Sequence, residues 1–312
     1  MQRFTSRCAC LLGSRQHVHR ETIERGEINS GELLTQDTSH MRFDLHVHTT
    51  ASDGTRDAPE VIDLAVDGGL DVVSITDHDT VAGLDVAMTA AADRPIQVIA
   101  GIEVSSTWDG AEYHILGYFV DPEAASVKGH ERRAVKGRER RMKDMVDRLR
   151  QQGLMIVMDD VTDEAGPNRF AIGRPHLARA LVSRGYANSV PDAFDRLIGD
   201  RHPAFVPTRL AAPDEAIQLI VDGGGIPVWA HPPRRSFDRL LPEFVRAGLR
   251  GVEVYRPRSE PKHIEKLRRA AESFDLLVSG GSDWHDPDRG VGLGDFFVTE
   301  DQVGALLEAG ER

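Results

Sequence analysis

The sequence has 312 residues, 40% of them hydrophobic, and a formal net charge of −12. This length is sufficient for one large domain with an insertion. The apolar runs are short and interrupted by charges, which argues against a membrane-spanning segment. The acidic balance argues against affinity for duplex DNA, which favours a basic surface. The only cysteines, Cys8 and Cys10, are too close for an easy disulfide, so we expect a reducing, cytoplasmic location.

The first segment, residues 1–40, differs from the rest of the chain because it lacks a sustained helical or strand period. Its apolar patch is too short for the core of a signal peptide. We expect a disordered N-terminal extension or the product of an over-called start codon, with the folded part beginning at Met41.

From Met41 onward, short apolar runs alternate with helical periods on short loops. This alternation predicts parallel βα units, and hence an α/β barrel or a doubly wound sheet. In chain order we expect a strand at 42–48, a helix at 59–67, a strand at 71–76, a helix at 81–92, and strands at 96–104 and 113–120. The alternation resumes with a helix at 213–221, a strand at 226–230, a helix at 237–247, a strand at 251–255, a helix at 261–272, a strand at 276–279 and a helix at 301–307.

Residues 122–208 break this rhythm, because they are rich in helical patterns and poor in strand patterns. We expect them to form a mostly helical insertion that caps a barrel made of 41–121 and 209–312. Within the insertion, residues 128–150 carry ten Lys or Arg against four Asp or Glu. Most of these charges are expected on a solvated amphipathic helix, but one or two arginines could hold a substrate phosphate.

Histidines and carboxylates recur at the ends of the predicted strands. His46 and His48 are two residues apart on a strand, so their side chains point to the same face. Active sites of barrels and open α/β sheets gather at the carboxyl ends of strands. Imidazoles and carboxylates without thiolates suit two or three divalent cations such as Mn²⁺, Fe²⁺ or Zn²⁺. The candidate metal ligands are His46, His48, Asp53, His78, Glu103, His114, His231, Asp283 and His285.

These residues fall in six motifs. They are D-x-H-x-H-T with S-D-G at 44–54, T-D-H-D at 76–79, G-x-E at 101–103, Y-H-x-x-G-Y at 113–118, A-H-P at 230–232 and S-D-x-H at 282–285. Together the motifs resemble those of the polymerase and histidinol phosphatase family, the PHP domain, over residues 41–312. The resemblance implies a distorted (β/α)₇ barrel with a trinuclear metal site. It implies one metal on His46, His48, Glu103 and Asp283, a second on Glu103, His114 and His231, and a third on Asp53, His78 and His285.

The insertion after Tyr118 and the G-R-P-H sequence at 173–176 resemble the stand-alone bacterial branch of this family. That branch acts on nucleotides, as a 3′,5′-nucleoside bisphosphate phosphatase or as a 5′→3′ exonuclease on short RNA. The resemblance therefore implies a metal-dependent phosphoesterase in which a metal-bridging hydroxide attacks the phosphate of a nucleotide or a short RNA. Such a cluster of cations would both activate water and neutralise the phosphoryl oxygens.

Three residues of the insertion are candidates for contacts with the substrate. Arg141 and Arg174 could hold a second phosphate, because a guanidinium group matches phosphate oxygens. His176 could protonate the leaving oxygen, or it could make a contact at the start of a helix that Pro175 begins. Trp108 and Tyr113 could stack on a base, although packing is the more common role of such residues.

Other functions stay open at this point. The protein could be a phosphatase for a small molecule such as histidinol phosphate, or a metal-binding sensor without turnover. An amidohydrolase also begins with H-x-H on a barrel strand, but Glu103 takes the bridging place here and the later motifs fit a phosphoesterase better. The sequence leaves the metal, the exact substrate and the oligomeric state undetermined.

Overall fold

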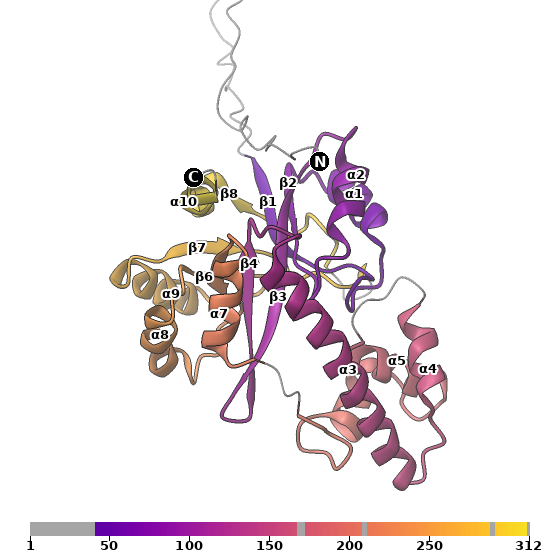
Figure 1. Ribbon diagram of the computed structural model, residues 1–312. Helices are drawn as coiled ribbons and strands as arrows, with labels where there is room; N and C mark the ends of the chain where they lie inside the picture. Colours follow the sequence, from indigo (N-terminus) through magenta and orange to yellow (C-terminus); the bar gives the residue numbers. More distant parts are fainter. Residues whose placement is uncertain (1–40, 167–171, 208–210, 288–290, 311–312) are drawn as a thin grey trace, which may run out of the picture.

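The computed structural model describes residues 41–166, 172–207, 211–287 and 291–310 (Figure 1). The expectation of disorder at 1–40 lies outside these ranges. The described strands form one sheet in the order β7-β6-β5-β4-β3-β2-β1-β8. A bridge between Val47 and Trp284 joins the end of β1 to the segment after β7, so the sheet curls into a nearly closed barrel. The predicted α/β barrel is confirmed.

The strands lie close to their predicted positions. β1, β2 and β3 are parallel, as are β5, β6 and β7. A two-residue strand, β8, was not predicted and pairs antiparallel with β1. The strands are β1 (Arg42–Val47), β2 (Val72–Ile75), β3 (Gln97–Trp108), β4 (Ala111–Tyr118), β5 (Ile226–Trp229), β6 (Gly251–Tyr255), β7 (Leu277–Gly280) and β8 (Val298–Thr299).

The expectation of parallel βα units is wrong at β4, which runs antiparallel to both β3 and β5. Only Asp109 and Gly110 separate β3 from β4, and both have positive φ, at 51° and 74°. A two-residue Asp-Gly connection of this kind makes a tight hairpin, because its backbone twist matches that of the paired strands. No crossover helix fits in this connection, so β4 must return beside β3.

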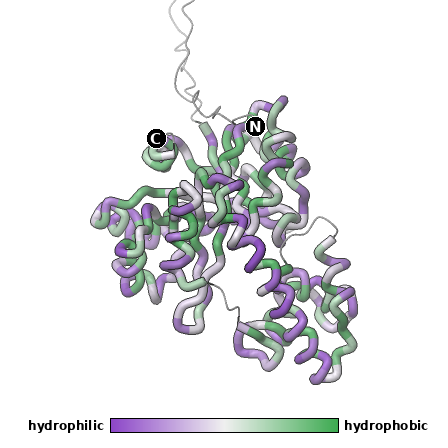
Figure 2. Tube along the Cα trace, in the orientation of Figure 1, coloured by the Kyte–Doolittle hydropathy of each residue, from purple (hydrophilic) through white to green (hydrophobic). Residues whose placement is uncertain are grey.

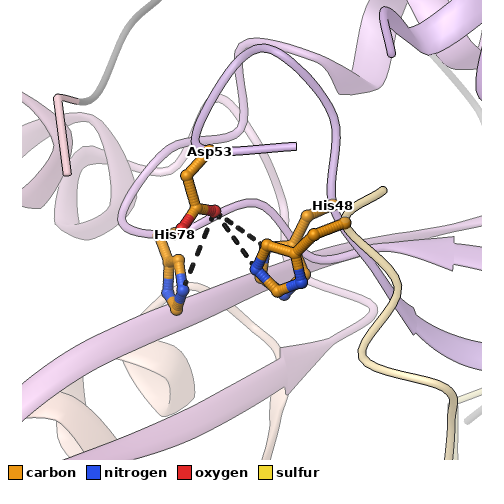
Figure 3. Close-up of side chains that lie close together, drawn as sticks. His48, Asp53 and His78 are labelled. Atoms are coloured by element: carbon orange, nitrogen blue, oxygen red, sulfur yellow. Dashed lines mark ion pairs between the residues drawn. The ribbon is translucent and has the colours of Figure 1, made fainter. Parts of the chain in front are cut away.

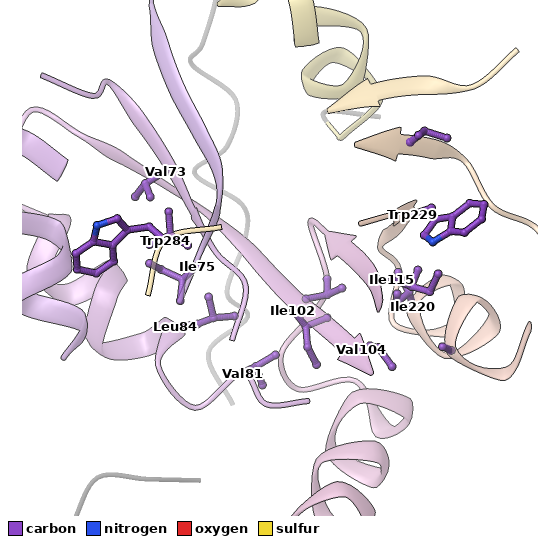
Figure 4. Close-up of a cluster of buried hydrophobic side chains, with 14 of the residues drawn as sticks. Val73, Ile75, Val81, Leu84, Ile102, Val104, Ile115, Ile220, Trp229 and Trp284 are labelled. Carbon is purple, nitrogen blue, oxygen red and sulfur yellow. The ribbon is translucent and has the colours of Figure 1, made fainter. Parts of the chain in front are cut away.

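Helices cover the outside of the barrel. α1 begins at a capping box, in which the Asp57 side chain accepts from the Glu60 backbone N–H and the Glu60 side chain accepts from that of Asp57. Figure 4 shows part of the core between strands and helices, with Ile102 and Ile115 from the strands near Ile220 of α7. The barrel helices are α1 (Ala58–Asp67), α2 (Leu84–Ala91), α7 (Pro213–Asp222), α8 (Phe237–Arg246), α9 (Pro261–Ser273) and α10 (Glu300–Gly310).

The segment between β4 and α7 is helical and has its own hydrophobic cluster, which includes Met145, Leu149, Leu177 and Leu181. Figure 2 shows hydrophobic strands at the centre of the molecule and hydrophilic residues along much of α3. No helix in the described ranges is long and apolar enough to cross a membrane. The helices of this segment are α3 (Ala125–Gln151), α4 (Met158–Ala165), α5 (Arg174–Ser183), α6 (Val190–Ala193) and the π-helical turn η1 (Phe194–Ile198).

A buried polar contact fixes α3 to the barrel. Asp79, which follows β2, accepts the backbone N–H of Ser105 at 2.8 Å and lies 2.9 Å from Nε2 of His130. Its other oxygen accepts Nε of Arg138 at 2.9 Å. Burial disfavours the charged carboxylate, but Arg138 and His130 outweigh this effect and hold the pKa of Asp79 below its ordinary value. Two α3 residues thus share one barrel carboxylate.

Candidate metal centre

The first part of the site lies at the end of β1, with His46 in the strand and His48 directly after it. His46 and His48 are fully buried and point to the same side, as the two-residue spacing predicts. Nε2 of each imidazole lies 3.3 Å from the same oxygen of Glu103 and 3.4 Å from Oδ1 of Asp283. The two Nε2 atoms and Oε2 of Glu103 have no hydrogen-bond partner among the described residues. Four side chains thus direct donor atoms at one point.

A second group lies beside the first. Oδ1 of Asp53 is 3.3 Å from Nε2 of His285, 3.8 Å from Nδ1 of His48 and 4.0 Å from Nε2 of His78. Figure 3 shows the Asp53 carboxylate facing both His48 and His78. The loop that carries Asp53 is held by the buried Asp77, which accepts hydrogen bonds from the Thr49 backbone N–H and hydroxyl and from the Ser52 hydroxyl.

The third group surrounds the other oxygen of Glu103. Oε1 of Glu103 lies 3.0 Å from Nδ1 of His114 and 3.0 Å from Nε2 of His231. His114 comes near the start of β4, yet it pairs in register with Ser105, two residues beyond Glu103. Because β4 is antiparallel, its beginning lies at the end of the barrel where the parallel strands finish. The structure therefore brings all nine predicted ligands together.

The residues of this cluster fit divalent cations. The donor atoms fall into overlapping groups that include His46, His48, Glu103 and Asp283; His48, Asp53, His78 and His285; and His78, Glu103 and His114. Buried polar atoms normally have partners, so convergent imidazole and carboxylate atoms without hydrogen bonds suit a metal ion. Burial disfavours the charged carboxylate of Glu103, but His78, His114 and His46 hold its pKa well below the ordinary value. Glu103 belongs to two of the groups and would supply a carboxylate ligand to each.

An arginine cluster, made of Arg141 and Arg174, adjoins the ligands on the side of the insertion. Glu112 on β4 lies 3.2 Å from Nε2 of His114 and 3.9 Å from Nη2 of Arg174. Burial opposes ionisation of Glu112, but the hydrogen bond with His114 and the charge of Arg141 lower its pKa to about 2. Arg174 also pairs with Asp200 at 2.5 Å. The guanidinium groups of Arg141 and Arg174 both lie over the Phe205 ring.

Arg141 is buried, and only part of its guanidinium group has hydrogen-bond partners. Its Nε donates to the Val206 carbonyl at 2.7 Å, whereas Nη2 is buried without a hydrogen-bond partner among the described residues. Burial, reinforced by the neighbouring charges of Arg174 and Arg138, lowers the pKa of Arg141 to about 10. A guanidinium group that is short of acceptors and near two other guanidinium groups is suited to an anion.

The other candidates differ in their surroundings. Nδ1 of His176 accepts the backbone N–H of Gly173 at 2.9 Å, which is the helix-start contact considered from the sequence. Burial and the charge of Arg179 lower the pKa of His176 to about 4. Tyr113 is buried and packs edge-on against Trp229, so packing is its role. Trp108, at the end of β3, is 41% exposed.

Sequence reasoning missed two carboxylates that contact the ligands, Glu112 and Glu253. Glu253 lies on β6 with Oε1 2.8 Å from Nδ1 of His46. The signal for Glu253 was an acidic residue inside the apolar strand G-V-E-V-Y, which is costly unless the charge is paired. For Glu112 the signal was its spacing, two residues from His114 on the same strand.

Comparison with known proteins agrees with this geometry. The PHP domain family model matches residues 44–136. A 5′-3′ exoribonuclease of Haemophilus influenzae is 33% identical over 84% of this chain and 96% of its own length. A 3′,5′-nucleoside bisphosphate phosphatase of Chromobacterium violaceum is 33% identical over 83% of this chain and 92% of its own. The solved structure of a C. violaceum amidohydrolase with bound sulfate and no metal superposes with a TM-score of 0.77 at 31% identity, covering 86% of this chain and 96% of that one. Because these likenesses extend over nearly the whole length of the relatives, the chain belongs to the PHP domain family.

Proposed function

We propose that the protein is a metal-dependent phosphoesterase that removes phosphate from a nucleoside 3′,5′-bisphosphate or from the 5′ end of a short RNA. The observation that carries this proposal is the convergence of nine imidazole and carboxylate side chains beside a partly unsatisfied arginine cluster. Two relatives that are 33% identical bear names with these two activities, which supports the same substrate class.

The proposed metal ligands are the nine residues of the cluster, with Glu103 shared between positions. The cations, Mn²⁺, Fe²⁺ or Zn²⁺, would supply Lewis acidity, which activates water and neutralises the phosphoryl oxygens. The protein supplies the geometry, since His46 and Glu103 lie on strands of the barrel, His48 directly follows β1, and all three are fully buried. Donors on rigid elements hold their positions while charge moves to the leaving group.

We assign Arg141 and Arg174 to the phosphate that is not hydrolysed. Both guanidinium groups lie near Glu112, which contacts the proposed ligand His114, so a second phosphate there would be close to the metal centre. The unsatisfied Nη2 of Arg141 gains an acceptor when an anion binds. A substrate with two phosphates uses both the metal cluster and the arginine cluster, whereas a monophosphate uses only the first.

His176 remains the proposed proton donor for the leaving oxygen. In the free protein its imidazole is neutral at neutral pH, because burial and Arg179, together with Arg138, outweigh the charge of Asp53 and lower its pKa to about 4. A phosphate dianion beside the ring would raise that pKa, since a nearby negative charge favours the imidazolium form. In the neutral form Nδ1 accepts from Gly173 and Nε2 carries the hydrogen. To donate a proton from Nε2, the ring must first become the imidazolium, in which Nδ1 is also protonated and the contact with Gly173 is broken.

The test is phosphate release by the Mn²⁺-loaded protein from four substrates: adenosine 3′,5′-bisphosphate, AMP, histidinol phosphate and a short 5′-phosphorylated RNA. We expect fast release from the bisphosphate or the RNA and slow release from AMP, because AMP lacks a group for the arginine cluster. Turnover confined to histidinol phosphate would contradict the nucleotide assignment. Release from none of the four substrates would contradict the proposal that the protein is a phosphoesterase.

A further inference from the structure

We infer that Glu253 and Arg256 form a positioning pair that fixes three proposed metal ligands, His46, His231 and Asp283. The inference rests on the metal centre proposed above and adds two residues that are not themselves ligands. Both residues belong to one short segment, with Glu253 inside β6 and Arg256 directly after it.

Glu253 is fully buried and makes contacts with two ligand-bearing segments. Its Oε1 lies 2.8 Å from Nδ1 of His46 on β1, and its Oε2 accepts the backbone N–H of His231 at 2.7 Å. His231 has a φ of 30°, in the left-handed region that residues other than glycine rarely adopt. The hydrogen bond from its N–H therefore holds a strained backbone in the conformation that turns the imidazole toward Glu103.

The contact with Glu253 also decides which nitrogen of His46 can bind a metal. An ionised carboxylate only accepts hydrogen bonds, so Nδ1 of His46 carries the hydrogen that faces Glu253. Nε2 then keeps its lone pair, and this atom lies 3.3 Å from Glu103 and 3.4 Å from Asp283 in the ligand group. A carboxylate behind a ligating histidine fixes both the tautomer and the orientation of the ring.

Arg256 extends the same arrangement to Asp283. Its Nη2 donates to Oδ2 of Asp283 at 2.9 Å, and its Nε lies 3.5 Å from Oε2 of Glu253. This contact occupies one oxygen of Asp283 and leaves Oδ1 facing His46 and His48. Asp283 also has a positive φ, 56°, a backbone conformation that surrounding contacts must hold in place.

The pair acts on two of the three proposed metal positions, one that contains His46 and Asp283 and one that contains His231. His46 and Asp283 belong to the group that also contains His48 and Glu103. Within the described ranges, neither Glu253 nor Arg256 forms an ion pair with Asp53, His78 or His285. The ion pairs of Asp53 are with His48, His78 and His285. A purely structural role would instead lower the stability of the metal-free protein and weaken every position together. The two roles therefore predict different binding curves.

The experiment is calorimetric titration of Mn²⁺ into metal-free protein, with the thermal midpoint measured in chelator. The variants are Glu253→Gln and Arg256→Met, and the control is Glu243→Gln, which alters a residue of α8 outside the metal centre. We expect Glu253→Gln to weaken the positions of His46 and His231, and Arg256→Met mainly that of Asp283, by about 10- to 100-fold, with the position of Asp53, His78 and His285 unchanged. The control should match the wild type.

Unchanged affinity at every position in a folded Glu253→Gln protein would overturn the inference, as would uniform weakening with a lower thermal midpoint. If Glu253→Gln does not fold, Arg256→Met decides by the same criteria, since its side chain is one-third exposed. A wild-type protein that binds no Mn²⁺ would contradict the proposed function instead, so the two failures are distinguishable.

Discussion

At the scale of single residues, the proposed role of Arg141 and Arg174 predicts that the protein separates substrates by their number of phosphates. We predict that Arg174→Ala lowers kcat/KM for adenosine 3′,5′-bisphosphate by about 10- to 100-fold, because a hydrogen bond to a charged group contributes about 1.5–3 kcal/mol. Its effect on AMP should be small, since AMP has no second phosphate. Steady-state phosphate release from both substrates measures the difference.

The matched control for this prediction is Arg184→Ala. Arg184 lies at the end of α5 and also pairs with a carboxylate, Asp160 at 3.7 Å, but outside the arginine cluster. Arg184→Ala should leave kcat/KM unchanged for both adenosine 3′,5′-bisphosphate and AMP. An equal loss on the bisphosphate and on AMP would show that Arg174 acts on the hydrolysed phosphate or on the fold, and would contradict its assignment.

The sequence made the nine ligand candidates visible because histidine and carboxylate motifs recur at strand ends. It did not reveal Glu253 as a partner of His46, since this contact joins β6 to β1, two strands that are not neighbours in the sheet. Spacing along the chain carries no information about such a contact. The neutral state of His176 was also hidden, because it depends on burial and on the charge of Arg179.

At the scale of elements, the contacts of Asp79 with His130 and Arg138 of α3 stabilise the fold. We predict that Asp79→Asn lowers the free energy of unfolding by about 3–5 kcal/mol at pH 7, because it leaves the buried Arg138 without a charged partner. Urea denaturation of metal-free protein measures this. As a control, Asp238→Asn removes an exposed pair with Lys266 and should cost less than about 1 kcal/mol.

The loss of stability caused by Asp79→Asn should depend on pH in a defined direction. The pKa of Asp79 is below its ordinary value of 3.8 in the folded protein, so its ionised form stabilises the fold above that pH. The contribution decreases as pH falls below 3.8 toward the folded pKa. The difference between wild type and Asp79→Asn should therefore be full at pH 7 and smaller in acid. Equal urea midpoints for the wild type and Asp79→Asn at pH 7 would contradict the stabilising role of the contact between Asp79 and α3.

The order of elements could be predicted, but one strand direction could not. Helix and strand periods marked the elements of the barrel except β8, since each buries one face against the core. The antiparallel β4 depends on the Asp109-Gly110 turn, whose positive φ values make a hairpin. The predicted strand at 96–104 ends too early for the same reason, because β3 continues through this hairpin arm to Trp108.

At the scale of the whole molecule, the barrel and the helical segment each supply part of the proposed site. The barrel provides the nine candidate ligands, and α3 and α5 provide Arg141 and Arg174. The two parts contact each other through Glu112 and through Asp79. In the proposed arrangement, a phosphate bound by the arginines lies beside groups that also contact a proposed metal ligand, which predicts a preference for substrates with two phosphates.

The most direct test of this arrangement is phosphate release from adenosine 3′,5′-bisphosphate while Mn²⁺ is added back to chelated protein and the bound metal per chain is counted. We predict no release without metal and a rise that levels off at two or three Mn²⁺ per chain. Asp283→Ala and His78→Ala should bind less metal and lose turnover while keeping the fold. Release by the fully chelated protein, or unchanged activity in either folded variant, would contradict the proposed metal centre.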